Sequence, residues 1–204
     1  MLKSKQSKDK QAGLVRGFTL LEITVVVAVV LTLSAIAIGQ FMRMMYNIQL
    51  RSAAAEFADL TQQARMNAAR SNGTYPIRFR MASGLQEIYI DLNNNSSLDA
   101  NEPRIDLPKS VTAASGAPNG SYGQPTAYTL VGDTTSGTPF DNSNVLAYSP
   151  RGLPCNYTSS VCTTPASSYF VYYFQDSRGN GWSAVLVTKS GRSKVLMWNG
   201  GSWK

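Results

Sequence analysis

The clearest absence in this 204-residue chain is histidine, of which there is none. Histidine is the commonest general base near neutral pH, the commonest metal ligand, and the base in Ser-His and Cys-His nucleophile pairs. We therefore expect the chain not to be an enzyme. A catalytic domain on a membrane anchor is the alternative, but the sequence contains no recognisable constellation of nucleophile and base.

Charge is missing from one stretch near the N-terminus. Residues Ile23 to Gly39 contain no charged side chain, and Glu22 stands directly before them. The first 17 residues contain five basic residues and one acidic residue, a net charge of +4, which leaves 14 basic and 11 acidic residues, a net +3, for the remainder. A basic segment followed by an apolar one is the outline of an export signal.

An ordinary secretory signal is one interpretation of this segment. It would be cut after Ala37, because Ala35-Ile36-Ala37 follows the small-x-small rule. However, its apolar region would be unusually long and would open with Glu22. A carboxylate inside a membrane-spanning segment costs roughly 2.5–3.5 kcal/mol on insertion scales, so it usually has a charged partner or a task.

The run Gly17-Phe18-Thr19-Leu20-Leu21-Glu22 resembles the class III signal of type IV pilins and type II secretion pseudopilins, which follows a short basic leader. The resemblance implies that a prepilin peptidase cuts between Gly17 and Phe18 and N-methylates Phe18. It also implies that the Phe18 amine of one subunit offsets Glu22 of its neighbour during assembly. This partner charge is why we favour the pilin-like signal.

Proline is absent from Phe18 to Arg70, where Gly39 is the only glycine. This predicts one helix of 53 residues, about 80 Å long at 1.5 Å per residue. Its first part is apolar on every side, as a lipid-embedded or bundle-buried helix must be. Gly39 weakens it by about 1 kcal/mol relative to alanine. Beyond Gln40 apolar residues recur every three or four positions and predict docking against a domain, at Leu50, Ala54, Phe57, Leu60, Ala64 and Ala68.

The hydrophobic period changes to two after Asn72-Gly73, a pair suited to a helix C-terminus. Residues 113–144 are rich in Gly, Ser, Thr, Pro and Asn, and we expect mostly loops there. In the segment Trp182 to Thr188, a period of two places Trp182, Ala184 and Leu186 on one face. The predicted strands cover 77–81, 85–92, 127–131, 169–174, 182–188 and 194–198.

These elements predict an α+β fold, in which a long hydrophobic and amphipathic helix, the pilin stem, packs against an antiparallel β-sheet domain. The expected organisation is a leader over residues 1–17, a transmembrane or filament-core helix over 18–39, its amphipathic half over 40–72 and a β-rich domain over 73–204. About 130 residues are enough for one globular domain with its own core.

Cysteine is scarce, and the only two are Cys155 and Cys162. They enclose a polar loop of six residues. In an exported domain such a pair predicts a local disulfide rather than a metal or redox site.

One Asn-rich segment has the spacing of an EF-hand calcium loop. Oxygen side chains stand at loop positions 1, 3, 5, 9 and 12, with Ser96 where glycine is expected, and the flanks do not read as two helices. An Asn-rich hairpin tip held by side-chain-to-backbone bonds explains the same residues without metal. The candidate calcium ligands are Asp91, Asn93, Asn95, Asp99 and Glu102.

The last 28 residues carry basic side chains and no acidic ones. Basic groups can neutralise phosphates, while aromatic side chains such as Trp182, Trp198 and Trp203 can stack on bases. Solvated hairpin charges around core tryptophans are the alternative interpretation. The candidate DNA-binding residues are Arg178, Lys189, Arg192 and Lys194.

Two segments, Tyr148-Ser149-Pro150-Arg151-Gly152 and Gly191-Arg192-Ser193-Lys194, look like the minor pseudopilin group called GspH/FimT. In DNA-uptake members of that group a Gly-Arg-x-Arg loop binds DNA. Here lysine replaces the second arginine, which keeps the charge but loses the fork geometry.

The sequence therefore predicts a minor pseudopilin of a type II secretion system, with a type IV pilus minor pilin that binds DNA for uptake as the alternative. The expected partners are other pilins or pseudopilins in a filament, prepilin peptidase and the inner membrane. We expect a single-pass inner-membrane protein with its C-terminal domain in the periplasm.

Overall fold

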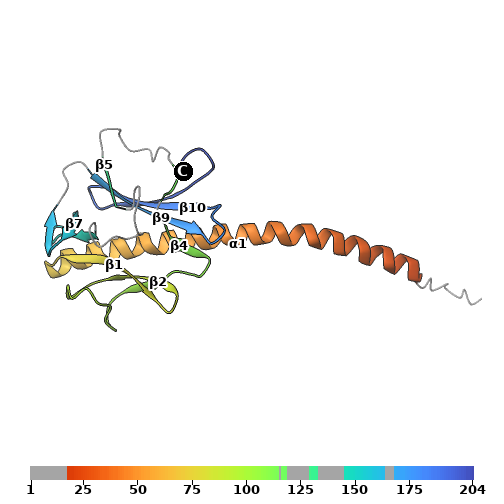
Figure 1. Cartoon of the computed structure of the whole chain (residues 1–204), viewed down its shortest axis with the longest axis horizontal. Coiled ribbons are helices and arrows are strands. Elements are labelled where there is room, and N and C mark those ends of the chain that lie inside the picture. The colour runs from red at the N-terminus through yellow and green to blue at the C-terminus, as the bar shows by residue number, and fades with distance from the viewer. Residues whose placement is uncertain (1–17, 115, 119–128, 133–144, 164–167) are drawn as a thin grey trace, which may run out of the picture. The chain divides into compact units, whose positions relative to one another are not determined.

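A computed structural model describes residues 18–114, 116–118, 129–132, 145–163 and 168–204. The chain divides into two compact units, Met1–Met42 and Arg43–Lys204. One helix, α1 (Leu20–Ser71), contributes to both units (Figure 1). It continues through Gly39, as the absence of proline predicts.

The N-terminal part of α1 has no covering layer among the described residues. Every residue from Leu20 to Met42 is exposed, including large apolar side chains such as Leu31 and Ile36. This stretch is long and apolar enough to cross a membrane. Its length and composition are compatible with a single membrane-spanning anchor.

The C-terminal end of α1 is closed by a Schellman motif, in which a backbone N–H bonds to the carbonyl five residues earlier. The Gly73 N–H donates to the Ala68 carbonyl at 3.2 Å, and Asn72 adopts the left-handed conformation at φ 51°. A Cβ at Gly73 would lie 3.1 Å from the Tyr75 ring, so glycine gives this turn room. Asn72 therefore takes the backbone role that glycine usually fills.

Two sheets pack around the C-terminal half of α1. A six-stranded sheet has the order β3-β2-β1-β6-β7-β8 and a five-stranded sheet the order β11-β10-β9-β4, with β5 beside β9. All pairs are antiparallel except β5 with β9. The strands are β1 (Tyr75–Ala82), β2 (Leu85–Ile90), β3 (Arg104–Asp106), β4 (Val111–Ala113), β5 (Thr129–Gly132), β6 (Val145–Tyr148), β7 (Pro154–Thr158), β8 (Val161–Thr163), β9 (Ser168–Asp176), β10 (Trp182–Val187) and β11 (Ser193–Met197).

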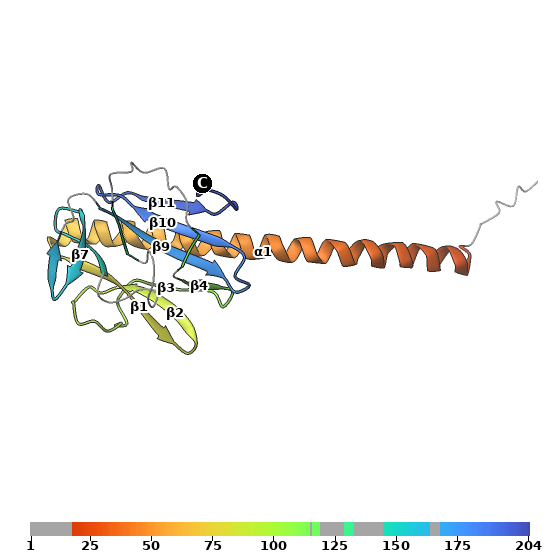
Figure 2. The same ribbon diagram turned by 45° about the horizontal axis from the view of Figure 1, so that its top comes forward.

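The main core lies where this half of α1 passes between the sheets, with β1 and β2 on one side and β9 and β10 on the other (Figures 1 and 2). Phe57 is fully buried, and its ring centroid lies 5.9 Å from that of Phe79 on β1 and 5.2 Å from that of Tyr172 on β9. The predicted helix stripe is confirmed, since all six residues are buried: Leu50, Ala54, Phe57, Leu60, Ala64 and Ala68.

Strand β10 is buried on both faces. Val185 and Val187 pack into the main core, while Trp182, Ala184 and Leu186 join a second cluster that includes Trp203. The prediction that these three residues share a face is confirmed. What the sequence did not indicate is the cover on that face, which the C-terminal residues supply.

The prediction of an α+β fold, with a long helix packed against an antiparallel β-sheet domain, is confirmed, and the strands of that domain form two sheets. The predicted strands at 77–81, 85–92, 169–174, 182–188 and 194–198 match β1, β2, β9, β10 and β11 within two residues at most ends. The first two residues of the strand predicted at 127–131 lie outside the described residues. Most of the predicted loop region, residues 113–144, does so too. Strands β3, β4, β6, β7 and β8 were missed, since three to five residues carry too little periodicity.

Candidate functional sites

Glu22 lies in the first turn of α1, and a helix cap accounts for its position. Thr19 precedes the helix, and its Oγ1 accepts a hydrogen bond from the Glu22 N–H at 3.2 Å. Thr19-Leu20-Leu21-Glu22 is thus the sequence of a capping box, in which a Thr is followed three residues later by a Glu. A negative charge here also interacts favourably with the helix dipole. The Thr-x-x-Glu spacing is the signal that could have found this cap.

The proposed processing site is only partly within the described residues. Gly17 lies outside them, and Phe18 is 77% exposed. No described residue covers Phe18 or Glu22, so both are accessible to a partner.

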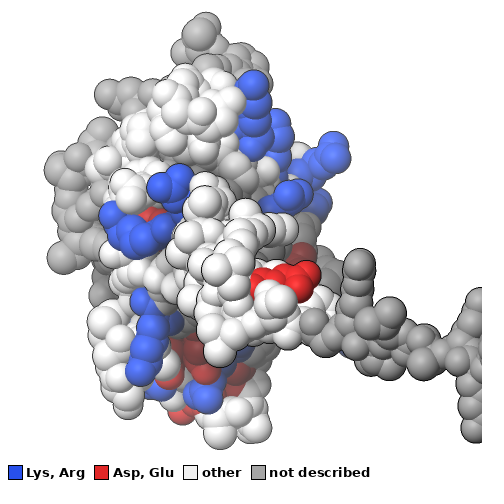
Figure 3. Space-filling view, turned by 90° about the vertical axis from the view of Figure 1, so that its right-hand side faces the viewer, with Lys and Arg blue, Asp and Glu red and all other residues white. Residues whose placement is uncertain are grey.

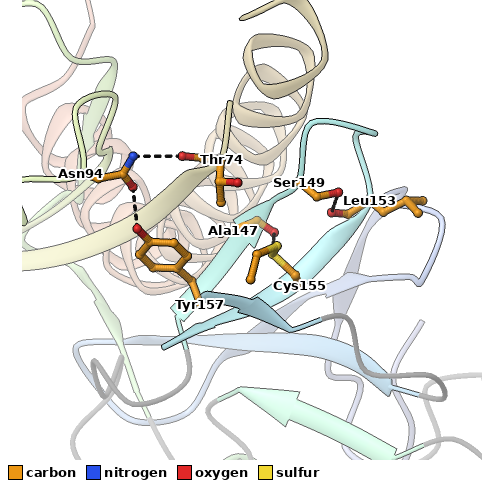
Figure 4. Close-up of a disulfide and its surroundings, with 8 residues drawn as sticks. Thr74, Asn94, Ala147, Ser149, Leu153, Cys155 and Tyr157 are labelled. Carbon is orange, nitrogen blue, oxygen red and sulfur yellow. Dashed lines mark hydrogen bonds between the residues drawn. A yellow bond between two sulfur atoms is a disulfide. The ribbon is translucent and has the colours of Figure 1, made fainter. Parts of the chain in front are cut away.

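The two cysteines form a disulfide across a tight hairpin, as expected (Figure 4). Their Cα atoms lie 5.4 Å apart, with β7 and β8 joined by a two-residue turn. Ser159 and Ser160 in that turn both have positive φ, which is the conformation of a type I′ turn. Tyr157 on β7 donates to Asn94, whose amide donates to the Thr74 carbonyl, so the hairpin is tied to the Asn-rich loop.

That Asn-rich loop is held by its own hydrogen bonds. Asp91 is fully buried, and its carboxylate accepts the N–H groups of Asn95 and Ser96 and the Nε–H of Arg78, at 2.6 Å. Glu102 accepts the N–H groups of Leu92 and Asp99.

The amides of Asn93 and Asn95 donate to Asp99. Among the described residues no group of three or more His, Cys, Asp or Glu is placed to hold a metal ion. The hydrogen bonds of this loop are of the kind that the hairpin interpretation predicts, and the calcium site stays a prediction.

The structure does not bring the four candidate DNA-binding residues together. Arg178 lies in the β9–β10 turn, while Lys189 and Arg192 lie in the β10–β11 turn and Lys194 on β11. These turns are at opposite ends of β10, whose six residues span roughly 20 Å. Figure 3 likewise shows the Lys and Arg side chains of one face in separate groups.

The two segments that resemble the GspH/FimT group meet in space. Gly191 has φ 79°, and a Cβ there would lie 3.1 Å from the Gly152 carbonyl oxygen and 3.2 Å from both the Arg65 side chain and the Tyr148 ring. Arg65 also donates to the Gly152 carbonyl at 3.1 Å. The glycines thus let two turns close on α1.

Polar side chains of α1 complete this junction. Gln62 donates to the Gly191 carbonyl at 2.9 Å and to the Ser193 hydroxyl at 2.8 Å, and Thr61 bonds to the same hydroxyl. Burial raises the pKa of Tyr148 to about 12, an effect that the nearby Thr61 and Ser193 hydroxyls and Arg65 only partly offset. The hydrogen bonds and close contacts of this junction join the two turns to α1.

The β9–β10 turn is built around Asp176, which is 3% exposed. Its Oδ1 accepts the N–H groups of Asn180 and Gly181, and its Oδ2 accepts Nε–H and Nη2–H of Arg178. Burial is the largest influence and raises the pKa of Asp176, but the two backbone N–H groups and Arg178 together outweigh it, so the net pKa lies below its ordinary value.

Replacing Gly191 tests whether the Gly-Arg-Ser-Lys turn is needed for folding. Gly191→Ala should lower the free energy of unfolding by about 2–4 kcal/mol, because it adds left-handed strain and crowding. Gly200→Ala is the matched control: Gly200 also has positive φ, at 92°, but its Cβ would meet nothing within 4 Å. Urea unfolding measures both, and equal losses would contradict a packing role for Gly191.

Acidification tests the ionised state of Asp176. A carboxyl with a lowered folded pKa stabilises the fold above its unfolded pKa, near 3.8, and loses that contribution as the pH falls through the folded value. The melting temperature should therefore fall between about pH 5 and pH 2, and by less in Asp176→Asn. The exposed Asp106→Asn is the control and should follow the wild type. A parallel decline for wild type and Asp176→Asn would refute this role.

Comparisons with protein-family models, with curated proteins and with solved structures each find no match to this chain. The described chain has a long, apolar N-terminal helix whose second half packs on antiparallel sheets, together with a disulfide. This arrangement is compatible with a pilin-like fold.

Proposed function

We propose that this protein is a minor pilin-like subunit of a membrane-anchored filament, and specifically a minor pseudopilin of the GspH/FimT group in a type II secretion system. The single observation that carries the proposal is the division of α1. From Leu20 to Met42 the helix is exposed, with Glu22 as its only charge, while one face of its other half is buried in the domain. Its work is mechanical rather than catalytic.

The exposed half of α1 explains how assembly would proceed. A contiguous apolar helix surface requires lipid or other apolar helices to cover it. Insertion in the inner membrane meets this need for the single subunit, and packing among neighbouring helices meets it in the filament. The domain would then lie on the periplasmic side.

Glu22 has a distinct task in this proposal. Its cap with Thr19 uses only the backbone N–H of Glu22, so the carboxylate stays available. After prepilin peptidase cuts behind Gly17, the N-methylated amine of Phe18 on a neighbouring subunit supplies the opposite charge. Pairing in an apolar surrounding is stronger than in water, so this contact would set the register between subunits.

The processed N-terminus and the Glu22 contact are tested in one preparation. Mass spectrometry should find an N-methylated Phe18, whereas a start at Ile38 would establish ordinary signal cleavage. Glu22→Gln should remove most of the subunit's cross-linking to its filament neighbours without loss from the membrane fraction. Asp59→Asn, an exposed acidic residue on the docked half of α1, is the control and should assemble normally.

DNA capture by a type IV pilus minor pilin is the second candidate. The observation that favours it is that Arg192 and Lys194 are exposed and that their side chains form no hydrogen bond or ion pair with the described part of the chain. Neighbouring genes would separate the systems: secretion genes favour the first candidate, and pilus or competence genes the second.

A gel-shift series tests DNA binding. Replacing Arg192 and Lys194 with Ala should weaken single-stranded DNA binding and reduce the salt dependence by about one ion per substitution. Arg178→Ala is the control, since Arg178 lies at the other end of β10 and should bind like the wild type. Affinity unchanged by the double substitution would exclude this turn as a DNA site.

A further inference from the structure

A hollow of about 380 Å³ opens between α1 and the β9–β10 turn, within the unit that begins at Arg43. Five of its six lining residues have polar or charged side chains: two guanidinium groups, two side-chain amides and one carboxylate, beside one glycine. These residues are Arg43, Asn47, Asp176, Arg178, Asn180 and Gly181.

The only carboxylate in the hollow is already occupied. Both Asp176 oxygens accept hydrogen bonds, from the turn's own N–H groups and from Arg178. Arg178 uses two of its five N–H donors in this pair, so three are left for a ligand. Its guanidinium carbon lies 3.9 Å from the Tyr46 ring centroid, which holds the side chain in place.

Arg43 gives the hollow its excess positive charge. The Asp176–Arg178 pair is neutral, and Arg43 forms no hydrogen bond or ion pair with any residue that the structure describes. One net positive charge, free guanidinium donors and two amides are the groups that recognise a phosphate monoanion with neighbouring hydroxyls.

The position of Arg43 along α1 indicates where that phosphate comes from. Arg43 is the first charged residue after Glu22 and directly follows Met42, the last residue of the apolar unit. A cation at the end of a membrane-spanning helix lies at the level of the lipid headgroups, and a tyrosine such as Tyr46, one turn further, prefers the same interface. This step rests on the membrane anchoring in the proposed function.

We propose that this hollow is a binding site for the phosphate group of an anionic phospholipid. Arg43 and Arg178 contact the phosphate, while Asn47 and Asn180 bond to headgroup hydroxyls. A net charge of +1 matches phosphatidylglycerol, which carries one negative charge, and discriminates against phosphatidylcholine, which carries none overall. The lipid would fix the height of the domain above the membrane before the subunit enters a filament.

Isothermal titration calorimetry on the full chain in a non-ionic detergent tests the site. Dioctanoyl phosphatidylglycerol should bind saturably and more tightly than dioctanoyl phosphatidylcholine. Arg43→Gln should weaken that binding about fivefold, as expected for loss of one partly exposed charge contact. Arg51→Gln, which removes an exposed arginine two turns along α1, is the matched control and should bind like the wild type.

Each other outcome overturns the proposal. Equal affinity for the two lipids would show no anionic selectivity, and an unchanged affinity in Arg43→Gln would place binding elsewhere. Inorganic phosphate that binds as tightly as the lipid would make this a free-phosphate site. Displacement of the lipid by a single-stranded oligonucleotide at equal concentration would make it a nucleic-acid site. Asn47→Ala, with circular dichroism to confirm folding, provides a second variant.

The lipid proposal and the filament proposal can fail separately, and different outcomes distinguish the two cases. A chain that keeps residues 1–17 and still selects phosphatidylglycerol would retain the lipid site and lose prepilin processing. An N-methylated Phe18 with no lipid selectivity would do the opposite. Release of the chain from membranes by alkaline carbonate would remove the anchoring on which both depend.

Discussion

The packing of Phe57 between the two sheets is the contact on which the rest of the domain depends. Its ring touches Phe79 on one side and Tyr172 and Phe174 on the other, all within 6 Å between centroids. Small residues on the same stripe, Ala54, Ala64 and Ala68, let both sheets approach the helix backbone. Because neither sheet alone could bury its inner face, α1 serves as the shared core element of the domain.

The turns that carry the candidate functional motifs are held by contacts within the domain. Gly191 closes against Gly152 and Arg65, and the Gln62 amide bonds to both Gly191 and Ser193. The loop from Asp91 to Glu102 likewise uses its carboxylates to bind its own backbone N–H groups. A motif glycine such as Gly191, or a carboxylate such as Asp91, can therefore be required for folding before any ligand is considered. A buried carboxylate needs hydrogen-bond donors close by, and a crowded backbone leaves no room for a side chain.

The charged residues considered for function do not form one patch: two lie at the ends of the apolar run of α1, and the others lie at the two ends of β10. Glu22 sits in the first turn, where the cap and the dipole favour it, and Arg43 follows the apolar run as the next charge. The basic residues near the C-terminus are divided between the two ends of β10. Arg178 therefore lies apart from Lys189, Arg192 and Lys194, and it shares the hollow with Arg43 instead.

The sequence by itself determined the elements whose signals are local. The absence of proline predicted α1, the three-to-four spacing predicted its buried stripe, and alternation predicted β1, β9, β10 and β11, because these patterns depend on the geometry of one helix or strand. Cys155 and Cys162, close in the chain, indicated their own disulfide. Tertiary structure alone decided the rest: the division into two sheets, the meeting of Gly152 with Gly191, and the hollow that joins Arg43 to Asn180. The members of each of these pairs lie far apart in the chain, and only packing around α1 brings them together.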